Sequence, residues 1–524
     1  MSQIKIYDTT LRDGNQDRNI SFSLEDKIII AQKLDELGVH YIEGGWPNAS
    51  NPTDLEFFKQ IKDIEIKNAK IAAFGSTRGL NTTAENDPIL RSLIESEAEV
   101  ITIFGKTWDL HVTDIIKTTL EENLAMIEES IAYLKKYCGE VIFDAEHFFD
   151  GYRSNPDYAL AALGAAVKGG ADCLVLCDTN GGLMPTEYAQ IVSAVIEAYP
   201  NSEIGLHNHN DSGCAVANAI AGFEVGATHV QGTINGIGER CGNADLCTII
   251  ANIELKLGKE SIGKESLKKL TEASLFVNEV ANIQHNSHLP YVGQAAFAHK
   301  GGAHIDGVLK KSISFEHVEP EVVGNERTLI LSDQSGGATI VEKLKKIYPD
   351  IDKSDPIVKE ILFKVKEMES QGYQFEVADG SFQLLAKKIK GDYTEPFNIQ
   401  GYRVIEEKRN GGEPYSEATI KVFANDKIVH TAAEGDGPVN ALDNAIRKAL
   451  TKFYPQLAEV HLKNFKVIVI EGDSGTSSKV RVTIETSDGN EVWGTVGVSE
   501  NIIEASWIAL IDSINYKLMK ETNN

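Results

Sequence analysis

Cysteine is scarce in this sequence, and long hydrophobic runs are missing. Six cysteines occur in 524 residues, and no two of them form a CxxC pair. This pattern argues against a disulfide framework and is typical of reduced thiols in a cytoplasmic protein. No apolar stretch approaches the roughly 20 residues that a membrane-spanning helix needs. Strand-like residues begin at Ile4 and leave no room for a signal peptide. We therefore expect cytoplasmic localisation and no membrane partner.

Positive charge is also in short supply. Lysine and arginine total 51 against 77 aspartates and glutamates, which gives a formal net charge of −26. Such a charge argues against nucleic acid or an anionic membrane surface as a partner. An anionic substrate would need a local positive site, because the overall field of the protein repels it. The length of the chain predicts two or three domains.

The first half of the chain alternates between short apolar runs and amphipathic stretches. Helical periodicity occurs at 24–37, 120–136, 185–198 and 215–223, and eight strand-like runs occur at 4–10, 41–45, 70–76, 100–106, 140–146, 173–179, 203–209 and 229–236. Eight strand–helix units in about 250 residues predict an α/β fold of the TIM (β/α)8 barrel type. The rival fold is a doubly wound open sheet. It normally carries a glycine-rich loop after its first strand, and "TTLRDGNQ" is not such a loop.

The second half of the chain has a different organisation. A mostly helical region, roughly 256–390, contains the polar loop "AHKGGAHIDGVLK" and a charged helix at 355–370. Segments 420–450 and 480–510 then share one layout: strand, tight turn, strand, glycine-containing loop, helix. This internal repeat predicts a C-terminal α+β domain of two stacked copies, and the alternative is a chance likeness of two hairpins. We expect domains at 1–270, 271–394 and 395–524.

Polar residues gather where the predicted barrel strands end. His207 and His209 are two residues apart on a strand, so their imidazoles point to the same face. The carboxyl ends of barrel strands form the active-site rim, and the other polar residues there are Arg12, Asp13, Glu43, Ser76, Arg78, Glu146, His147, Asp178, Thr179, Asn235 and Asn243. Two imidazoles with nearby oxygen ligands predict a divalent metal site. Mg²⁺, Mn²⁺ and Zn²⁺ all remain open.

A metal at this rim predicts a type of chemistry. Two free coordination positions would suit a 2-oxo acid that binds through its carboxylate and ketone oxygens, and the metal would polarise the ketone as a Lewis acid. Arg12, beside Asp13, would stabilise a developing alkoxide. The alternative role for Arg12 is a structural ion pair at the mouth of the barrel.

Several motifs carry a resemblance to a known family. "DTTLRDGNQ" (8–16), "HNHNDSGCAVANAIAGFEVGA" (207–227) and "NGIGERCGNADL" (235–246) resemble signatures of the 2-isopropylmalate/homocitrate/citramalate synthase family. Segments 435–450 and 495–518 resemble the C-terminal regulatory domain of that family. Segment 6–47 is most similar to the citramalate branch. The likeness covers nearly the whole chain.

The resemblance implies an acyltransferase that condenses a 2-oxo acid with acetyl-CoA and then hydrolyses the thioester. It implies Arg12 and Glu146 as catalytic residues, Thr179 as a ligand of the 2-oxo acid's carboxylate, and four metal ligands: Asp13, His207, His209 and Asn243. His304 matches a histidine that reaches the partner subunit's active site, which implies an obligate homodimer. Glu146 and His304 are the candidates for removing a proton from the acetyl methyl group, alone or as a pair that orients a water.

The citramalate branch implies pyruvate as the 2-oxo acid and isoleucine as a feedback inhibitor. Helix starts at 435–440 and 497–501 present backbone N–H groups to an effector carboxylate, and Asp436 or Glu500 would receive its ammonium. Phe74, Phe104 and Phe143 are candidate linings of a small substrate pocket. One departure from the family is Phe315, where relatives commonly carry tyrosine. The alternatives are 2-isopropylmalate or homocitrate synthase, and a catalytically inactive amino-acid sensor.

Overall fold

The computed structural model describes residues 3–331, 335–408, 410–470 and 478–522. The chain forms two compact units, and each is described by itself. The first unit comprises Met1–Phe297 and His317–Arg327, and the second comprises Ala298–Glu316 and Thr328–Asn524. Within the described ranges, no helix combines the length and the apolar character that a membrane crossing requires.

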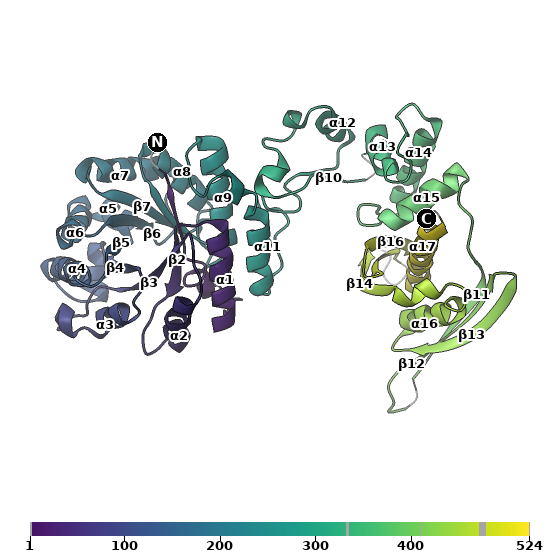
Figure 1. Ribbon diagram of the computed structural model, residues 1–524, viewed down its shortest axis with the longest axis horizontal. Coiled ribbons are helices and arrows are strands. Elements are labelled where there is room, and N and C mark those ends of the chain that lie inside the picture. Colours follow the sequence, from purple (N-terminus) through teal and green to yellow (C-terminus); the bar gives the residue numbers. More distant parts are fainter. Residues whose placement is uncertain (1–2, 332–334, 409, 471–477, 523–524) are drawn as a thin grey trace. The chain divides into compact units, whose positions relative to one another are not determined.

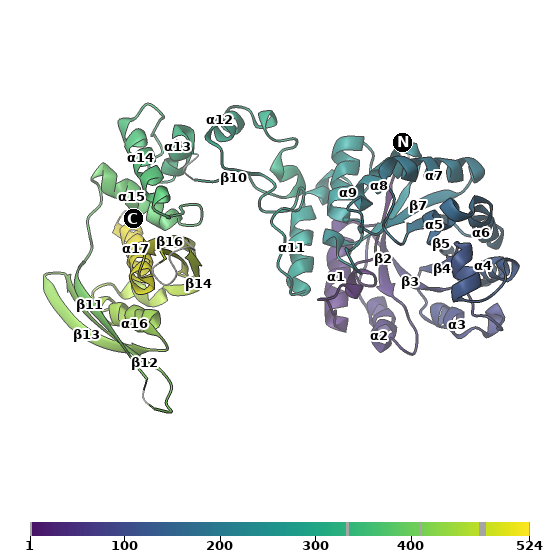
Figure 2. The same cartoon turned by 180° about the vertical axis from the view of Figure 1, so that it is seen from behind.

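The first unit is a closed barrel of eight parallel strands (Figures 1 and 2). Neighbours in the sequence pair in order, and β1 pairs with β8 to close the ring. This confirms the predicted TIM barrel. The strands are β1 (Lys5–Asp8), β2 (Tyr41–Gly45), β3 (Lys70–Ser76), β4 (Val100–Lys106), β5 (Glu140–Glu146), β6 (Cys173–Asp178), β7 (Glu203–Asn208) and β8 (His229–Gly232).

Helices surround the strands of this unit (Figure 1). They are α1 (Leu24–Leu37), α2 (Pro52–Gln60), α3 (Pro88–Glu95), α4 (Leu120–Leu134), α5 (Phe148–Ser154), α6 (Pro156–Gly169), α7 (Pro185–Ala198), α8 (Ala215–Val225), α9 (Leu246–Asn252), α10 (Lys264–Leu267) and α11 (Leu270–Val280). Local signals set their ends. Ser23 and Asp26 form a capping box at the start of α1, and Gly38 ends it with a φ of 87°.

Strand alternation divides the barrel's buried residues into two layers. Tyr7, Tyr41, Val100 and Val175 belong to one small cluster. We assign this cluster to the inside of the ring, because its members occupy every second position of a strand and so share one face of the sheet. The intervening residues, such as Ile6 and Leu174, belong to the large cluster that also includes the buried faces of the helices. A side chain's position along its strand therefore decides whether it faces the barrel interior or the helices.

The second unit begins with a mostly helical part. Its elements are β9 (Ala298–His299), α12 (Gly302–Lys310), β10 (Thr328–Leu329), α13 (Gly337–Lys345), α14 (Pro356–Ser370) and α15 (Asp379–Lys390). The charged helix predicted at 355–370 is α14, and the Asp355 side chain caps it by accepting from the backbone N–H of Ile357. Ile340, Ile361 and Phe382 lie in the buried core of this part.

The C-terminal part contains the predicted repeat. One copy is β11 (Asn398–Glu407), β12 (Tyr415–Ala424), β13 (Lys427–Gly435) and α16 (Pro438–Leu450), and the other is β14 (His461–Val469), β15 (Val480–Ser487), β16 (Val492–Ser499) and α17 (Ile502–Thr522). In each copy the three strands form an antiparallel sheet in sequence order. The tight turn of the first hairpin places Asn425 and Asp426 at positive φ, as a two-residue type I′ turn requires. Each copy also has a first strand, β11 or β14, that the sequence did not predict.

Candidate metal centre and active site

Three predicted ligands converge at the carboxyl end of the barrel. Asp13 follows β1, His207 lies near the end of β7, and His209 follows directly after that strand. Their ligand atoms all lie within 4.8 Å of one another, and all three residues are buried. His207 Nε2 lies 3.3 Å from Asp13 Oδ2. A cluster this tight at the end of barrel strands has the geometry of a metal site.

Unpaired buried atoms show that this cluster fits a metal ion. Asp13 Oδ1, His209 Nδ1 and Asn243 Oδ1 are buried and have no hydrogen-bond partner within the part of the chain that the structure describes. Asn243 forms a backbone bridge with His209, and its Nδ2 donates to the Ile237 carbonyl, which leaves Oδ1 available. Buried polar atoms normally have partners. One carboxylate, two imidazoles and an amide oxygen suit Mg²⁺, Mn²⁺ or Zn²⁺.

The electrostatics of the cluster favour the ligand form of its side chains. Burial raises the pKa of Asp13, but Arg12 and then His207 outweigh burial and hold that pKa well below its usual range. Burial, together with the neighbouring His207, lowers the pKa of His209 to about 4. Asp13 is therefore ionised and His209 is neutral near pH 7, and these are the forms that bind metals.

A buried chain of hydrogen bonds orients His207. Its Nδ1 lies 2.8 Å from Gln231 Oε1, and Gln231 Nε2 donates to Asp144 Oδ1 over 2.8 Å. Burial raises the pKa of Asp144 to about 7. Because the amide oxygen of Gln231 accepts a hydrogen bond from Nδ1, the proton of His207 stays on Nδ1 and Nε2 faces Asp13. Partners of this kind fix the tautomer of a metal-binding histidine.

We expect Gln231→Met to weaken metal binding by about 10- to 100-fold, the usual cost of removing a residue that orients a metal ligand. Thr102→Val is the matched control. Thr102 is buried in the same interior but hydrogen-bonds Tyr7, so its loss should leave metal affinity unchanged. Metal titration of the purified variants measures both effects. Equal affinity in Gln231→Met and Thr102→Val would show that His207 does not depend on Gln231.

Arg12 contacts both the metal cluster and the ring of Phe74. Its Nε donates to Glu43, a fully buried carboxylate, and its Nη1 lies 3.3 Å from Asp13 Oδ2. The guanidinium carbon sits 3.8 Å from the centroid of the Phe74 ring. Two carboxylates and an aromatic face therefore fix the guanidinium plane, and a fixed planar donor can stabilise an oxyanion without reorganising.

Glu146 and Thr179 are held by separate contacts at the same rim. The Glu146 carboxylate forms an ion pair with Lys106 at the end of β4. Thr179 Oγ1 accepts from the backbone N–H of His147 over 2.8 Å, and Arg240 Nη2 donates to the Thr179 carbonyl over 2.6 Å. The Thr179 hydroxyl thus accepts one hydrogen bond and can donate its own proton to a ligand.

The cavity over the cluster has a volume of about 230 Å³. Its aromatic wall consists of Phe74 and Phe104, whose rings stack at 5.5 Å, and Trp46, which meets both rings edge-on. The prediction that Phe143 lines this cavity is wrong, because Phe143 lies in the cluster between strands and helices. On β5 the side chains of Ile142, Asp144 and Glu146 point into the barrel. Because side chains alternate along a strand, Phe143 points outward to the helices. The full lining is Arg12, Asp13, Gln16, Trp46, Phe74, Phe104, Asp144, Glu146, Cys177, Thr179, His207, His209, Glu239 and Arg240.

Other polar residues from the strand ends have structural partners instead. Arg78 is buried against α4, where it pairs with Glu122 and Glu129. Asp178 accepts the backbone N–H groups of Gly182 and Leu183, and Asn235 donates to Asn278 and the Ser274 carbonyl. His304 belongs to α12 of the second unit, where it is exposed and its ring stacks on Phe315 with centroids 4.5 Å apart.

Sequence families match successive parts of the chain. Residues 3–277 match the HMGL-like family. Residues 291–373 match the family described as homocitrate synthase post-HMGL domain-like. Residues 376–518 match the LeuA allosteric (dimerisation) domain.

Curated relatives match over nearly the full length. The (R)-citramalate synthase of Aquifex aeolicus is 55% identical over 520 residues, which cover 99% of this chain and 98% of the relative. The chain belongs to the citramalate synthase family. A citramalate synthase of Synechocystis sp. is 47% identical over 98% of this chain and 96% of its own, whereas a 2-isopropylmalate synthase of Clostridium kluyveri is 33% identical over 99% and 97%. These identities confirm the resemblance to the citramalate branch.

Proposed function

We propose that the chain condenses pyruvate with acetyl-CoA and water to give (R)-citramalate and CoA. Citramalate synthases share 44–55% identity with the chain over nearly its whole length. The observation that carries the proposal is the Asp13–His207–His209 cluster opening into a cavity of about 230 Å³ beside Arg12. A cavity of that size with three aromatic rings in its wall suits a 2-oxo acid whose side chain is a single methyl group.

In the proposed reaction, each residue at the rim has a distinct task. Asp13, His207, His209 and Asn243 would hold the divalent metal, which when bound acts as a Lewis acid on the ketone. Thr179 donates its hydroxyl proton to the carboxylate of pyruvate. Arg12 stabilises the negative charge that develops on the ketone oxygen when the acetyl carbon bonds to C2 of pyruvate. Water then cleaves the thioester, releasing the CoA thiol and the new carboxylate.

The proton of the acetyl methyl group needs a base at the rim. Glu146 is one candidate, and its ion pair with Lys106 holds the carboxylate at the rim. His304 is the other, alone or paired with Glu146 through an oriented water. The family resemblance assigns His304 to the active site of the partner subunit in a homodimer, and Phe315 supports its ring by stacking.

Exposed apolar side chains on an edge strand support the dimer. β14 is an edge of its sheet, and Leu462, Phe465, Val467 and Val469 on it are all exposed. An apolar edge of this kind is a site for pairing with another chain. We therefore propose that residues 395–524 dimerise the chain, and that they also regulate it. Residues 1–270 would carry out catalysis, and residues 271–394 would complete the active site. We propose that the enzyme is cytoplasmic.

If His304 serves the partner's site, two inactive variants should complement each other. We expect His304→Ala and Glu146→Gln homodimers to be inactive, and mixed dimers to regain up to about half of the wild-type activity per chain pair, because one of two sites then holds both native groups. CoA release measures activity, and native mass spectrometry verifies subunit exchange. Verified exchange without recovery would place His304 in its own chain's site or outside catalysis.

The choice of 2-oxo acid is tested by a CoA-release assay with pyruvate, 2-oxoisovalerate and 2-oxoglutarate. We expect pyruvate to have the highest kcat/KM. A preference for 2-oxoisovalerate would make the chain a 2-isopropylmalate synthase, and a preference for 2-oxoglutarate would make it a homocitrate synthase. No CoA release with any of the three, at saturating metal, would favour the inactive amino-acid sensor.

We also propose isoleucine as a feedback inhibitor, bound where α16 begins. Gly437 provides no side-chain cap to this helix and Pro438 has no N–H, so the next N–H groups, those of Val439 and Asn440, would bind the carboxylate. At the start of α17, by contrast, Asn501 Oδ1 already accepts from the N–H groups of Ile503 and Glu504. Asp436, directly before Gly437, would receive the ammonium.

We expect Asp436→Asn to raise the isoleucine concentration for half-inhibition by about tenfold, which is within the usual range of allosteric coupling. Glu500→Gln, at the capped start of α17, is the matched control, and isoleucine should inhibit it as strongly as the wild type. Point substitutions are sharper than a cut at residue 395, because a cut would also remove α17, which packs against α15. Unchanged inhibition in Asp436→Asn, or inhibition by leucine alone, would rule out this effector site.

A further inference from the structure

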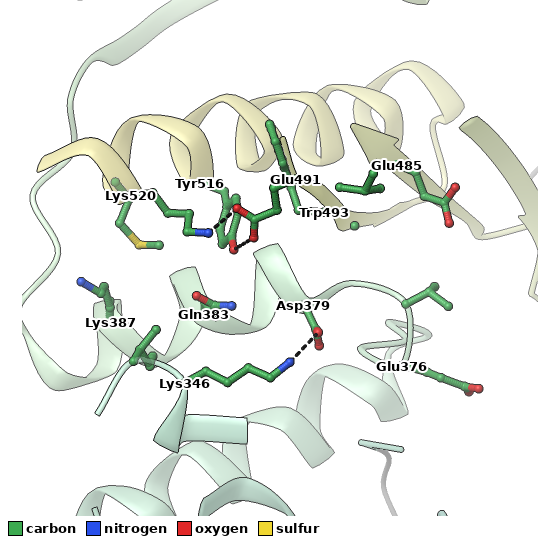
Figure 3. A pocket seen from close by; sticks show the side chains of 15 residues that line it. Lys346, Glu376, Asp379, Gln383, Lys387, Glu485, Glu491, Trp493, Tyr516 and Lys520 are labelled. Atoms are coloured by element: carbon green, nitrogen blue, oxygen red, sulfur yellow. Dashed lines mark hydrogen bonds and ion pairs between the residues drawn. The ribbon is translucent and has the colours of Figure 1, made fainter. Parts of the chain in front are cut away.

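Two cavities of the chain differ in the character of their walls. A cavity of about 700 Å³ in the second unit lies between α15, α17 and the β15–β16 hairpin, and Figure 3 shows the charged side chains around it. Several of these side chains pair with one another, as Glu491 does with Lys520. The active-site cavity of about 230 Å³ instead includes the rings of Trp46, Phe74 and Phe104 in its wall. An apolar wall of this kind can select a substrate by its size.

Trp46 is the one ring of this wall that a loop carries. It follows β2 directly, whereas Phe74 and Phe104 lie within β3 and β4. Its ring meets the Phe74 ring edge-on with centroids 6.0 Å apart, and the Phe104 ring with centroids 5.7 Å apart. The indole Nε1 is buried and has no hydrogen-bond partner among the described residues. The side chain therefore gives the wall its area and shape and makes no hydrogen bond to it.

Side chains from the segment after β2 hold the backbone of Trp46. Asp54, in the first turn of α2, accepts from the Trp46 N–H through Oδ2 at 2.9 Å. The side-chain amides of Asn48 and Asn51 donate to the Trp46 carbonyl over 3.2 and 3.3 Å. Both backbone polar groups of Trp46 are therefore engaged, and this turn fixes where the ring begins.

A buried lysine holds the same turn from the side of α1. Lys27 is 1% exposed, and its ammonium forms an ion pair with Asp54 Oδ1 and donates to the Gly44 carbonyl over 3.0 Å. The Asp54 carboxylate thus binds Lys27 with one oxygen and the Trp46 N–H with the other. Apolar residues of similar volume are often at least as stabilising as a buried ion pair. The value of this pair therefore lies in where it places Asp54.

The turn is packed too closely for Trp46 to withdraw from the cavity. Gly45 has a φ of 142°, and a Cβ on it would lie 2.4 Å from Asp54 Cγ. A Cβ on Gly44 would lie 2.2 Å from the ring of Phe57 on α2. Because α2 lies directly against the backbone that carries Trp46, moving the ring back requires moving α2, and close-packed interiors resist such shifts.

We propose that Trp46 sets the upper size limit for the side chain of the 2-oxo acid, and that the buried Lys27–Asp54 pair positions Trp46 for this task. This inference rests on the function proposed above, because it concerns the same substrate. A methyl group fits beside a fixed ring, whereas a branched side chain with two more carbons would have to displace it. Overpacking of this kind is destabilising. Lys27 and Asp54 are positioning residues, since they lie outside the cavity lining.

Substrate competition in the full-length, metal-loaded enzyme tests the size limit. CoA release with pyruvate, 2-oxobutanoate and 2-oxoisovalerate gives kcat/KM for side chains of increasing size. Trp46→Leu shortens the wall and breaks no side-chain hydrogen bond among the described residues. We expect it to raise the ratio of kcat/KM for 2-oxoisovalerate to that for pyruvate by at least about tenfold, because one methylene in an apolar pocket already changes kcat/KM by about 10- to 200-fold. The ratio for 2-oxobutanoate should rise less.

Phe58→Leu is the matched control for this substitution. Phe58 is a buried aromatic residue of α2 beside Gly44, but it lies outside the cavity lining. The control should lower the unfolding temperature, because it shortens a buried side chain, and should keep the substrate ratio of the wild type. This separates the shape of the wall from the stability of the β2–α2 turn.

The role of Lys27 is tested through its dependence on Trp46. Lys27→Met should raise the same ratio, though less than Trp46→Leu does. The double variant should show the ratio of Trp46→Leu alone, because residues that act through one another are not additive. Lys33→Met is the matched control, since Lys33 lies on the same helix but pairs with Glu36 and Glu272. If Lys27→Met lowered only the unfolding temperature and kept the ratio, Lys27 would be structural and its positioning role would be wrong.

Other outcomes would overturn the size limit itself. An unchanged ratio in Trp46→Leu, with a wild type that releases CoA with pyruvate, would reject the role of Trp46 and leave the proposed function intact. A Trp46→Leu variant that gains activity with propionyl-CoA but keeps its 2-oxo acid ratio would place Trp46 beside the acyl group. Loss of turnover in Trp46→Phe, which keeps a ring but lacks the N–H, would assign Trp46 to hydrogen bonding. No CoA release by the wild type with any 2-oxo acid would overturn the proposed function and this inference together.

Discussion

His207→Ala and His209→Ala should each lose nearly all turnover and most of the bound metal. Both imidazoles belong to the buried cluster with Asp13, and each would supply one of the protein's few ligands to the ion. Removing only a residue that orients a ligand costs about 10- to 100-fold in metal affinity, so removing the ligand itself should cost more than about 100-fold. Metal content after dialysis and CoA release measure the two losses.

The same variants should still fold. Residues at the carboxyl ends of barrel strands serve function, whereas the opposite end of the barrel serves stability. His229→Ala is the matched control, because His229 is equally buried but lies near the start of β8, where it packs against Tyr7 and Tyr41. It should lower the unfolding temperature and retain the metal. Full turnover of His207→Ala or His209→Ala at ordinary metal concentration would contradict the metal assignment.

Period-two alternation explains how much of this site the sequence could predict. Because His207 and His209 are two residues apart, alternation alone indicates that they share a face, and the structure brings them together with Asp13 from a different strand end. The same rule could have excluded Phe143. Glu146 faces the cavity, so Asp144, two residues earlier on β5, also faces inward. Phe143, three residues before Glu146, therefore faces outward, where it packs under the helices.

The residues that support the site were harder to predict. Glu43 was placed at the rim, but its pairing with Arg12 depends on which strands are neighbours in the closed ring. Gln231 lies within "HVQG", where a single amide carries no motif, and its role appears only when β7 and β8 are side by side. Alternation would have shown Asp144 and Gln231 to be polar and inward-facing, and a polar barrel interior beneath a candidate site is a usable signal.

In the C-terminal domain, the hairpins and helices were predictable and the first strands were not. β12 and β15 alternate between buried and less buried positions, which gives the period-two pattern of a half-buried strand. β14 is almost entirely exposed along its length, so it shows no such alternation. The repeat could be recognised from its turns and helices, but β14, the edge strand with exposed apolar side chains, could not.

Arg12→Lys should lower kcat by about 100- to 1,000-fold, the usual cost of losing an oxyanion donor, with a smaller change in the KM for pyruvate. Arg12 engages Glu43 and Asp13 through different nitrogens while its plane lies over Phe74. A lysine keeps the charge but has one ammonium on a flexible stem, so it cannot hold both carboxylates and still aim a donor at the ketone oxygen. Because that oxygen becomes negative only as the carbon–carbon bond forms, the loss should appear mainly in kcat.

Arg78→Lys is the matched control for this substitution. The Arg78 side chain is 6% exposed against 13% for Arg12 and pairs with Glu122 and Glu129, but it lies outside the lining of the active-site cavity. The control should lower the unfolding temperature and leave kcat within about twofold of the wild type, since surface and core changes away from a site act on stability. If Arg12→Lys instead kept its kcat and raised only the KM, Arg12 would bind the substrate equally in the ground state and the transition state, and the alkoxide would need a different donor.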